Sequence, residues 1–490
     1  MFEALYHALL NFGKPPVLLG LILGSVTGIT IGIIPTIGGF VALSILMGFA
    51  YKMDPYVALT FLIALTSVTY TGGSMTAILI NVPGSGLNVC TLVDGYPMTK
   101  KGQASRAMGA ALTASALGGA LSVLLALVMV TLVMRLVMAF HSPEMLFLIV
   151  VGLCFLGIVG TGSLIKGLIS GGMGLIISLV GFQALTGVPR FTFGSLYFFD
   201  GVNLICLVLG LFAMAEGIEL GLSHKPLMPA SELKAGFKEQ IEGAKDVFRH
   251  FWLFIRCTLV GYIVGILPGI GGETGIFVAY SLAKQTSKHP QLFGTGIVEG
   301  VIAPESANNA AQAGDLLCTL GFGIPGSAIM ALILGAFVMV GITPGPGMLT
   351  EHLDLSLTLL ICIFFANIMA GGLCFLFAPQ LLKCTTVHPT YLLCVVLVCV
   401  VAGALAAKEG VLTLLVLAIF GILGFLMKRF GYSRAALILG FVLGEPFEYY
   451  FFHSIMLHGS FFFLRPISLI LIAICIAFIA SELRKGAKKT

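Results

Sequence analysis

Long apolar stretches, separated by short polar segments, dominate the hydrophobic pattern of the chain. Several of them contain no charged residue and reach or exceed the roughly 20 residues that a membrane-spanning helix needs. These stretches run from Ala107 to Met134, Met145 to Ile165, Gly167 to Pro189 and Leu355 to Leu382, with Pro15 to Tyr51 and Leu316 to Thr350 long enough for a broken helix and its return. The pattern predicts an all-α polytopic membrane protein with about 12 membrane segments.

One stretch, Gly261 to Thr274, breaks this pattern by placing Pro268 and several glycines where a membrane helix should continue. Because proline removes a backbone donor and glycine lowers helix propensity, we expect the helix to open there. An isolated motif of this kind is equally compatible with a kink or a tight packing site. The motif occurs twice, however: Gly28, Gly32, Ile33, Pro35, Ile37, Gly38 and Gly39 match Gly261, Gly265, Ile266, Pro268, Ile270, Gly271 and Gly272 at one constant separation.

A second pair of helix breakers follows in the same order. Val82-Pro83-Gly84-Ser85 in the first half corresponds to Ile324-Pro325-Gly326-Ser327 in the second half. Interrupted helices at matching positions of two halves are typical of secondary transporters built from inverted repeats. We therefore expect two homologous repeats of opposite orientation with broken helices or re-entrant hairpins.

The repeats are expected at residues 1–222 and 257–490, the latter including C-terminal helices. A polar linker, residues 223–256, separates them, and its charged residues contrast with the apolar sequence on both sides. Phe237, Ile241 and Phe248 recur there at helical spacing, which predicts an amphipathic helix at the membrane surface.

Composition and missing motifs exclude several classes of protein. Charged residues make up 10% and hydrophobic residues 58% of the chain, and the mean hydropathy is +1.08, which argues against a soluble globular protein. The eleven cysteines form no C-x-x-C pair, so neither a disulfide framework nor a zinc site is predicted. The net charge of +5 gives no reason to expect a nucleic-acid partner. Nucleotide-binding loops and hydrolase motifs are missing, so we expect neither an enzyme nor a cofactor.

Polar residues near the breakers are the candidate ligands for a transported molecule. A broken helix presents free N–H groups to an anion at one end and free carbonyls to a cation such as Na⁺ at the other. The candidate substrate- or ion-binding residues are Asn81, Pro83, Gly84, Ser85, Asn88, Glu305, Asn308, Asn309, Pro325, Gly326 and Ser327, and the breaks that shape the site are Pro35, Gly38, Gly39, Pro268, Gly271 and Gly272. For each polar side chain the alternative is a local helix cap or Asx turn.

Three further expectations concern charges and loops. Glu305 and Glu273 lie in apolar surroundings, where a buried acid is costly and usually functional. Asp94 to Pro97 is expected to form a turn. The basic residues of the segment 428–434 and of the C-terminal tail favour a cytoplasmic side, which leaves a loop at His453 to His458 outside.

At these motifs the chain resembles the large membrane subunit of the bacterial tripartite tricarboxylate transporters. The resemblance rests on residues 28–39, 70–74, 81–84, 94–98, 101–102, 190–194, 261–272, 304–309 and 323–327, and continues more weakly over 437–444. It implies a multi-pass protein of the bacterial inner membrane that works with a small membrane subunit and an extracytoplasmic solute receptor. It also implies uptake of an organic carboxylate, driven by a gradient of Na⁺ or H⁺.

The residues alone leave other functions open. A receptor-independent carrier, an exporter or a channel for another small anion would show the same paired breakers. An intramembrane enzyme is a further alternative, although the sequence offers no recognisable set of catalytic groups. The particular carboxylate is not specified by any motif.

Overall fold

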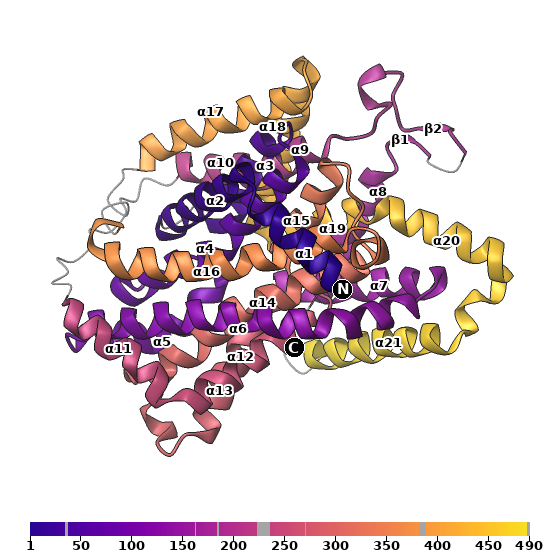
Figure 1. Ribbon diagram of the computed structural model, residues 1–490. Coiled ribbons are helices and arrows are strands. Elements are labelled where there is room, and N and C mark those ends of the chain that lie inside the picture. Colours follow the sequence, from indigo (N-terminus) through magenta and orange to yellow (C-terminus); the bar gives the residue numbers. More distant parts are fainter. Residues whose placement is uncertain are drawn as a thin grey trace.

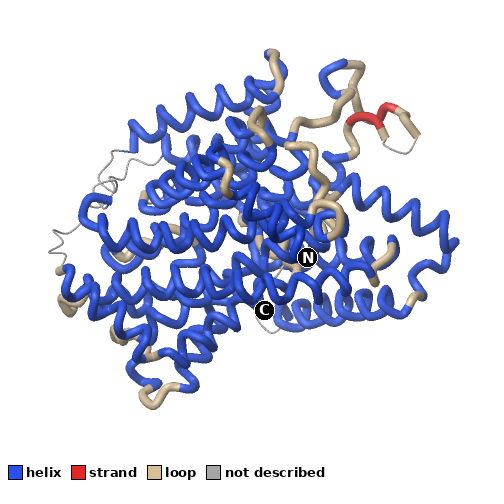
Figure 2. Tube along the Cα trace, viewed as in Figure 1, coloured by secondary structure: helices blue, strands red, loops and turns tan. Residues whose placement is uncertain are grey.

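The computed structural model describes residues 1–34, 38–161, 163–183, 186–222, 236–269, 271–381 and 389–487. These residues are mostly helical, and the two short strands among them, β1 (Gly181–Phe182) and β2 (Pro189–Arg190), pair in an antiparallel hairpin (Figure 2). Five described helices are long and apolar enough to cross a membrane: α2 (Pro15–Ile33), α4 (Pro55–Ile80), α6 (Ala104–Met138), α16 (Leu353–Leu381) and α18 (Val411–Phe430). The chain is therefore an all-helical, multi-pass membrane protein.

Two bent helix pairs raise the number of candidate spans to seven if each pair is one span. In the first, α11 (Phe237–Arg249) meets α12 (Phe251–Ile266) at 77°. In the second, α19 (Arg434–Val442) meets the segment formed by α20 (Gly444–His458) and η7 (Gly459–Leu464) at 47°. The number of about 12 membrane segments stays a prediction, because several of the other described apolar helices are shorter than a full membrane span.

Two buried helices, α4 and α14 (Glu299–Phe322), form the centre of the fold. Every residue of α14 from Gly300 to Phe322 is buried. The two helices run antiparallel, since Gln312 Nε2 donates to the Ser67 carbonyl at 3.0 Å while Ser74 Oγ donates to Glu305 at 2.7 Å. A core made of two helices from distant parts of the sequence leaves the surrounding helices to face lipid.

Glycines let a second helix approach each central helix closely. α2 packs on α4, and α12 packs on α14. A Cβ added at Gly265 would collide with the backbone of Ala311, and one added at Gly32 would collide with the backbone of Thr69. Small residues at a membrane helix interface replace side-chain contact by backbone contact, which brings the helix axes together.

Each of these glycine-lined helices stops beside its central partner. α2 ends at Ile33 and α3 (Gly38–Ala50) begins five residues later, as α13 (Gly271–Thr286) begins five residues after α12 ends at Ile266. Pro268 therefore lies between two helices, and Gly269 N there donates to the Pro325 carbonyl at 3.1 Å. Pro35 lies outside the described residues.

The central helices also end at breaks. α4 is capped by Asn81 with φ 58°, and α14 by Gly323 with φ 65°, both left-handed. After these caps the chain enters α5 (Val89–Lys100) through η1 (Gly86–Asn88) in one case and α15 (Ala328–Met339) in the other. The long helix that follows each central helix packs on the other central helix. Thus α6, which follows α4, packs on α14, and α16, which follows α14, packs on α4.

The remaining helices surround this centre (Figure 1). They are α1 (Phe2–Phe12), α7 (Ser142–Thr161), α8 (Leu164–Ser178), α9 (Leu204–Val208), the π-helix η3 (Leu209–Met214), α10 (Ala215–Leu222), α17 (Pro389–Ala407) and α21 (Pro466–Ala487), with short 3-10 turns at η2 (Leu196–Phe198), η4 (Pro290–Leu292) and η5 (Pro346–Leu349). Figure 1 shows α20 and α21 extending to one side of the centre beside α7.

Helix α11 occupies the described part of the predicted linker, and residues 223–235 lie outside the described residues. Its buried positions are polar or small, namely Gln240, Gly243 and Asp246 together with Val247, and Asp246 pairs with Arg106 of α6 at 2.6 Å. The side chains of Phe237, Ile241 and Phe248 are exposed on the other face. An exposed apolar stripe on a membrane protein is free to contact lipid.

Three local predictions are wrong. Asp94 to Pro97 lies inside α5 rather than in a turn, because the Asp94 carboxylate accepts hydrogen bonds from the backbone of Gly294, Gly296 and Ile297 and so anchors the helix to a distant segment. The stretch from Gly167 to Pro189 is not one helix, since α8 ends at Ser178 and the hairpin follows. His453 and His458 belong to α20, which packs on α7.

The backbone contact between α12 and α14 leads to a first prediction. In Gly261→Ala the new Cβ would lie 2.6 Å from Ala307 Cα, so the helices must separate, and we expect unfolding free energy to fall by about 1–3 kcal/mol. Thermal unfolding of the detergent-solubilised protein would measure this loss. Gly372→Ala on α16 is the control, because its Cβ would meet nothing within 4 Å, and an equal loss in both variants would contradict the packing argument.

Candidate functional site

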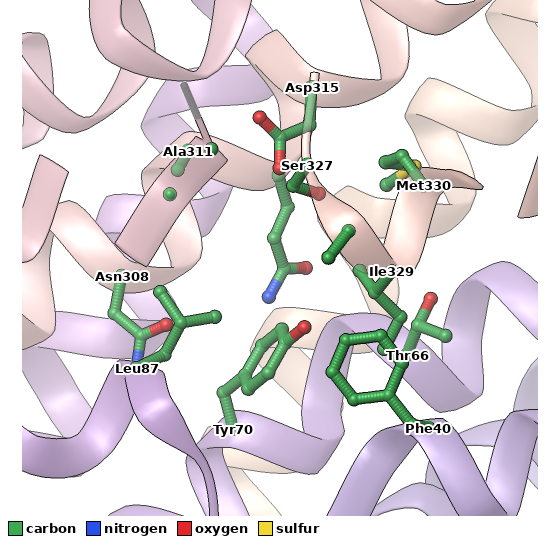
Figure 3. Close-up of a pocket in the computed structure, with 14 residues that line it drawn as sticks. Phe40, Thr66, Tyr70, Leu87, Asn308, Ala311, Asp315, Ser327, Ile329 and Met330 are labelled. Atoms are coloured by element: carbon green, nitrogen blue, oxygen red, sulfur yellow. The ribbon is translucent and has the colours of Figure 1, made fainter. Parts of the chain in front are cut away.

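A small cavity lies where α4 and α14 meet the first turns of α13 and α15 (Figure 3). Its lining residues come from six parts of the chain: Phe40 of α3, Thr66 and Tyr70 of α4, Leu87 of η1, Gly271 and Gly272 of α13, Asn308, Ala311, Gln312 and Asp315 of α14, and Ser327 to Met330 at the start of α15. The cavity leaves about 20 Å³ for the centres of water-sized molecules. That is room for about one water molecule or an ion, so an organic acid requires the site to widen.

Two helix N-termini give the cavity a positive electrostatic character. The first residues of α13 and α15 line it, and the first N–H groups of a helix have no partner within the helix. These groups and the helix dipole favour a bound anion. Gly271 and Gly272 carry no side chain, so a ligand can reach their backbone.

Several buried polar atoms in the cavity have no hydrogen-bond partner among the described residues. They are both amide atoms of Asn308, the Oε1 atom of Gln312 and the hydroxyl of Ser327. Asn308 is 0% exposed, Gln312 5% and Ser327 8%. Since a buried polar group without a partner costs about 1–3 kcal/mol, such a cluster is a candidate for binding a ligand or an ordered water molecule.

The polar residues of the first breaker are arranged differently, because they bond to one another. Ser85 Oγ donates to Asn88 Oδ1 at 2.8 Å. Asn88 Nδ2 in turn donates to the Tyr70 carbonyl at 2.9 Å and to Ser74 Oγ at 2.8 Å. Asn88 is thus the hydrogen-bond partner of the Ser85 hydroxyl, the Tyr70 carbonyl and the Ser74 hydroxyl at this breaker.

Glu305 lies at the centre of a cage of hydroxyl groups. Its carboxylate is fully buried and accepts hydrogen bonds from Ser74 at 2.7 Å, from Thr91 and from Ser115. These donors come from α4, α5 and α6, so Glu305 joins four helices. No described Lys or Arg forms an ion pair with it. The helix continues through the preceding Pro304 without a break.

The remaining candidates from the sequence occupy several places. Asn309 donates to Thr71 Oγ1 at 3.0 Å and to Asn367 Oδ1 at 2.5 Å, away from the cavity lining. Pro325 and Gly326 lie directly before the cavity residue Ser327, whereas Asn81 is exposed at the end of α4.

Pro83 precedes Gly84, and a Cβ on Gly84 would collide with Gly73. At the predicted break in the first half, Gly38 has a positive φ of 61°, and a Cβ on Gly39 would approach the side chain of Ile329. The side chain of Glu273 lies outside the described part of the structure.

Sequence reasoning missed Gln312 and Asp315, although a signal for them exists. Asn308, Gln312 and Asp315 follow one another at spacings of four and three residues, which places them on one face of a helix. A polar stripe on a fully buried helix of a membrane protein indicates a pathway or a site. Tyr70 and Thr66 of α4 face this stripe across the cavity.

The contrast between the two asparagines gives a second prediction. Asn88→Ala removes the partner of Ser85, Ser74 and the Tyr70 carbonyl, and we expect stability to fall by about 1–3 kcal/mol. Asn308→Ala removes a side chain that makes no described hydrogen bond, so its loss should be distinctly smaller. Thermal unfolding of both variants checks this, and an equal loss would show that Asn308 is bonded within the protein.

Comparison with known proteins identifies the family. The family model described as "Tripartite tricarboxylate transporter TctA family" matches residues 18–439. An uncharacterized 52.8 kDa protein in the TAR-I ttuC' 3' region of Agrobacterium vitis is 32% identical over 466 residues, which are 94% of this chain and 92% of the relative. An uncharacterized protein in the TAR-II ttuC' 3' region of the same organism is 36% identical over 188 residues, covering 38% of this chain and 78% of the relative. No solved structure matches. The chain belongs to the tripartite tricarboxylate transporter TctA family, a family of membrane transport subunits and not of enzymes.

Proposed function

We propose that this chain is the subunit of a secondary transporter that carries an organic carboxylate across the bacterial inner membrane, driven by a gradient of Na⁺ or H⁺. The observation that supports this most directly is the cavity itself. It combines two helix N-termini with the unpartnered amide of Asn308 and the unpartnered hydroxyl of Ser327. Such groups bind a carboxylate through N–H and O–H donors without a basic side chain.

The proposed partners follow from membership of the family. A small membrane subunit would complete the transporter, and an extracytoplasmic receptor would deliver the carboxylate. Di-, tri- and aromatic carboxylates all present the same anionic group to the helix N-termini, so the cavity supports a carboxylate as the class of substrate without favouring one of them. The proposal differs in this respect from a receptor-independent carrier, exporter or channel, for which delivery by a receptor is unnecessary.

We further propose that the transporter consists of two inverted repeats of about six membrane segments each. The helix contacts of the two halves support this. α2 packs on α4 as α12 packs on α14, α16 packs on α4 as α6 packs on α14, and α1 packs on α16 as α11 packs on α6. The repeats are separated by the linker of residues 223–256.

The orientation of the chain follows from its charges. Lys428 at the end of α18 pairs with Glu216 of α10 at 2.7 Å, which brings the basic segment 428–434 close to the chain that leads into the linker. By the positive-inside rule this side is cytoplasmic. We propose that α11 lies at the cytoplasmic membrane surface with Phe237 and Phe248 in contact with lipid.

Alternating access would then occur around the cavity. In the described conformation the cavity is too small for a carboxylate, which corresponds to a closed state. The breaks at Gly269 and Gly326 allow the segments on either side to move relative to α14. Asn88, Glu305 and Asn309 are proposed to hold the central helices together during this motion, because they bond to α4, α5, α6 and α16, and Ser85 is proposed to support them through its bond to Asn88.

Uptake into proteoliposomes would test the proposed function. The vesicles would hold this chain with its small subunit, and labelled carboxylates would be offered with and without the receptor under imposed Na⁺ or proton gradients. Gradient-driven uptake that needs the receptor is the expected result. Uptake without the receptor would favour a stand-alone carrier, and formation of a chemically altered product would favour an enzyme.

Variants of the cavity provide a third prediction. Asn308→Ala and Ser327→Ala each remove an unpartnered donor that can bond the carboxylate, so we expect the ratio kcat/KM of uptake to fall at least about tenfold. Asn11→Ala is the matched control, since Asn11 bonds Asp354 outside the cavity. Uptake by both cavity variants at the rate of this control would place the substrate elsewhere.

A further inference from the structure

Asp94 of α5 is a buried acid that is held by hydrogen bonds instead of by a basic side chain. It is 0% exposed, and none of the ion pairs among the described residues includes it. The backbone N–H groups of Gly294, Gly296 and Ile297 donate to its Oδ1 at 2.9, 2.8 and 3.2 Å, and the Tyr280 hydroxyl donates to its Oδ2 at 2.8 Å. A backbone N–H can only donate, so the ionised carboxylate is the form that fits these partners.

The segment that binds this carboxylate has the form of an anion site made from backbone. Gly294 and Gly296 have φ values of 89° and 97°, which glycine adopts without strain. Such turns direct neighbouring N–H groups into one concave space, called a nest, that suits an anion. Gly300 also needs to lack a side chain, because a Cβ there would collide with the Asp94 carboxylate. Residues 294–300 are therefore shaped around a carboxylate group.

This contact joins the two proposed repeats and occurs at one of two matching places. The nest belongs to residues 287–298, which connect α13 to α14, whereas α5 belongs to the first repeat. The matching connection of the first repeat, residues 51–54 between α3 and α4, is shorter. Counted from the prolines of the second pair of breakers, Ala336 of α15 corresponds to Asp94. The second repeat thus has the nest and the first repeat has the acid.

Helix α13 connects this contact to the cavity. Tyr280, which bonds Asp94, lies within α13, and its ring packs edge-on against Phe293 at a centroid distance of 5.5 Å. At the other end of α13, Gly271 and Gly272 line the cavity. A helix rises 1.5 Å per residue, so about 14 Å of continuous helix separates Gly271 from Tyr280. Holding α13 at Tyr280 and at the connection that follows it therefore limits the motion of the helix start.

The start of α13 forms a wall of the closed cavity. A Cβ on Gly272 would lie 2.9 Å from the Cβ of Ala311 in α14, so the two helices are in close contact there. A wider cavity requires this turn to move away from α14. Just before this turn, Gly269 N donates to the Pro325 carbonyl at 3.1 Å. The bonds of Asp94 add a second restraint, at the far end of the same helix.

We propose that Asp94 is a positioning residue whose carboxylate, bound in the nest of residues 294–297, holds α13 so that its first turn closes the cavity. We call Asp94, Tyr280 and residues 294–297 the Asp94 latch. Release of the carboxylate from the nest frees α13 to move away from α14 and widens the cavity. This inference rests on the proposed transport function, and it names the contact that controls access to the transport site.

Chemical labelling of a cavity residue tests the latch without a transport assay. Ile329 lines the cavity from α15 and is 5% exposed, so the thiol introduced by Ile329→Cys reports whether the cavity is open. The full-length chain in detergent would be treated with N-ethylmaleimide, and mass spectrometry would follow each cysteine separately. Asp94→Ala should raise the labelling rate at position 329 at least about tenfold, because local opening exposes the thiol. The natural Cys374 of α16, 0% exposed and outside the cavity lining, should keep its rate.

Rescue by an added anion separates the latch from a general structural role. Asp94→Ala leaves the nest without its carboxylate, and formate is small enough to take that place. Sodium formate should therefore restore slow labelling in Asp94→Ala, whereas the same concentration of sodium chloride should not.

Two further variants complete the test. Asp246→Asn changes another buried acid, which pairs with Arg106 of α6 and makes no described bond to α13, and should leave labelling at position 329 unchanged. Tyr280→Phe removes one donor from the latch and should give a smaller rise than Asp94→Ala. It also decides the matter if Asp94→Ala does not fold, as judged by size-exclusion chromatography.

The outcomes distinguish this inference from the proposed function. Unchanged labelling in folded Asp94→Ala, or in Tyr280→Phe if the former does not fold, would overturn the latch even if receptor-dependent uptake upheld transport. An equal rise at Cys374 would also overturn it, since the whole protein would then be loosened, and so would a rise that formate does not reverse. A rise at position 329 alone that formate reverses, together with no carboxylate uptake by the natural chain, would keep the latch and overturn the proposed transport.

Discussion

The close backbone contact of α12 with α14, and of α2 with α4, is the constraint on which the rest of the structure depends. Gly265 meets the backbone of Ala311, and Gly32 meets that of Thr69, with no side chain between them. Because each glycine-lined helix ends one residue later, this contact holds the broken ends against two of the most buried described helices. Broken ends are tolerated in a membrane only where protein or bound ligand satisfies their backbone groups, so the contact determines where a site can form.

The broken helices supply charge to a cavity that has no basic side chain. The first residues of α13 and α15 line it, so the free N–H groups of two helix starts lie at its wall. A lysine or arginine would also attract a carboxylate, but it would add a permanent charge that must cross the field of the membrane or be paired when the site is empty.

The sequence could predict the breaks, because proline and glycine act locally, and α12 does end just before Pro268. It could not distinguish Asn88 from Asn308. Both lie near a breaker in similar composition, yet Asn88 bonds the Tyr70 carbonyl and Ser74, whereas Asn308 makes no described hydrogen bond. Which asparagine is satisfied depends on helices far away in the sequence. Distant residues also decide the structure at Asp94, where the sequence predicts a turn. The backbone N–H groups of Gly294, Gly296 and Ile297 donate to the Asp94 carboxylate, and the segment is helical.

The two breakers differ in how the polar groups around them are satisfied. Asn88 fills the first breaker and ties it to α4, and the hydroxyls around it extend this network to Glu305. At the cavity beside the second breaker, the amide of Asn308 and the hydroxyl of Ser327 have no hydrogen-bond partner among the described residues. The polar groups of the first breaker are therefore satisfied by one another, whereas these two groups of the second breaker are not. Since opening a site requires breaking whatever closes it, the half with fewer internal hydrogen bonds is the one that moves at lower cost in free energy.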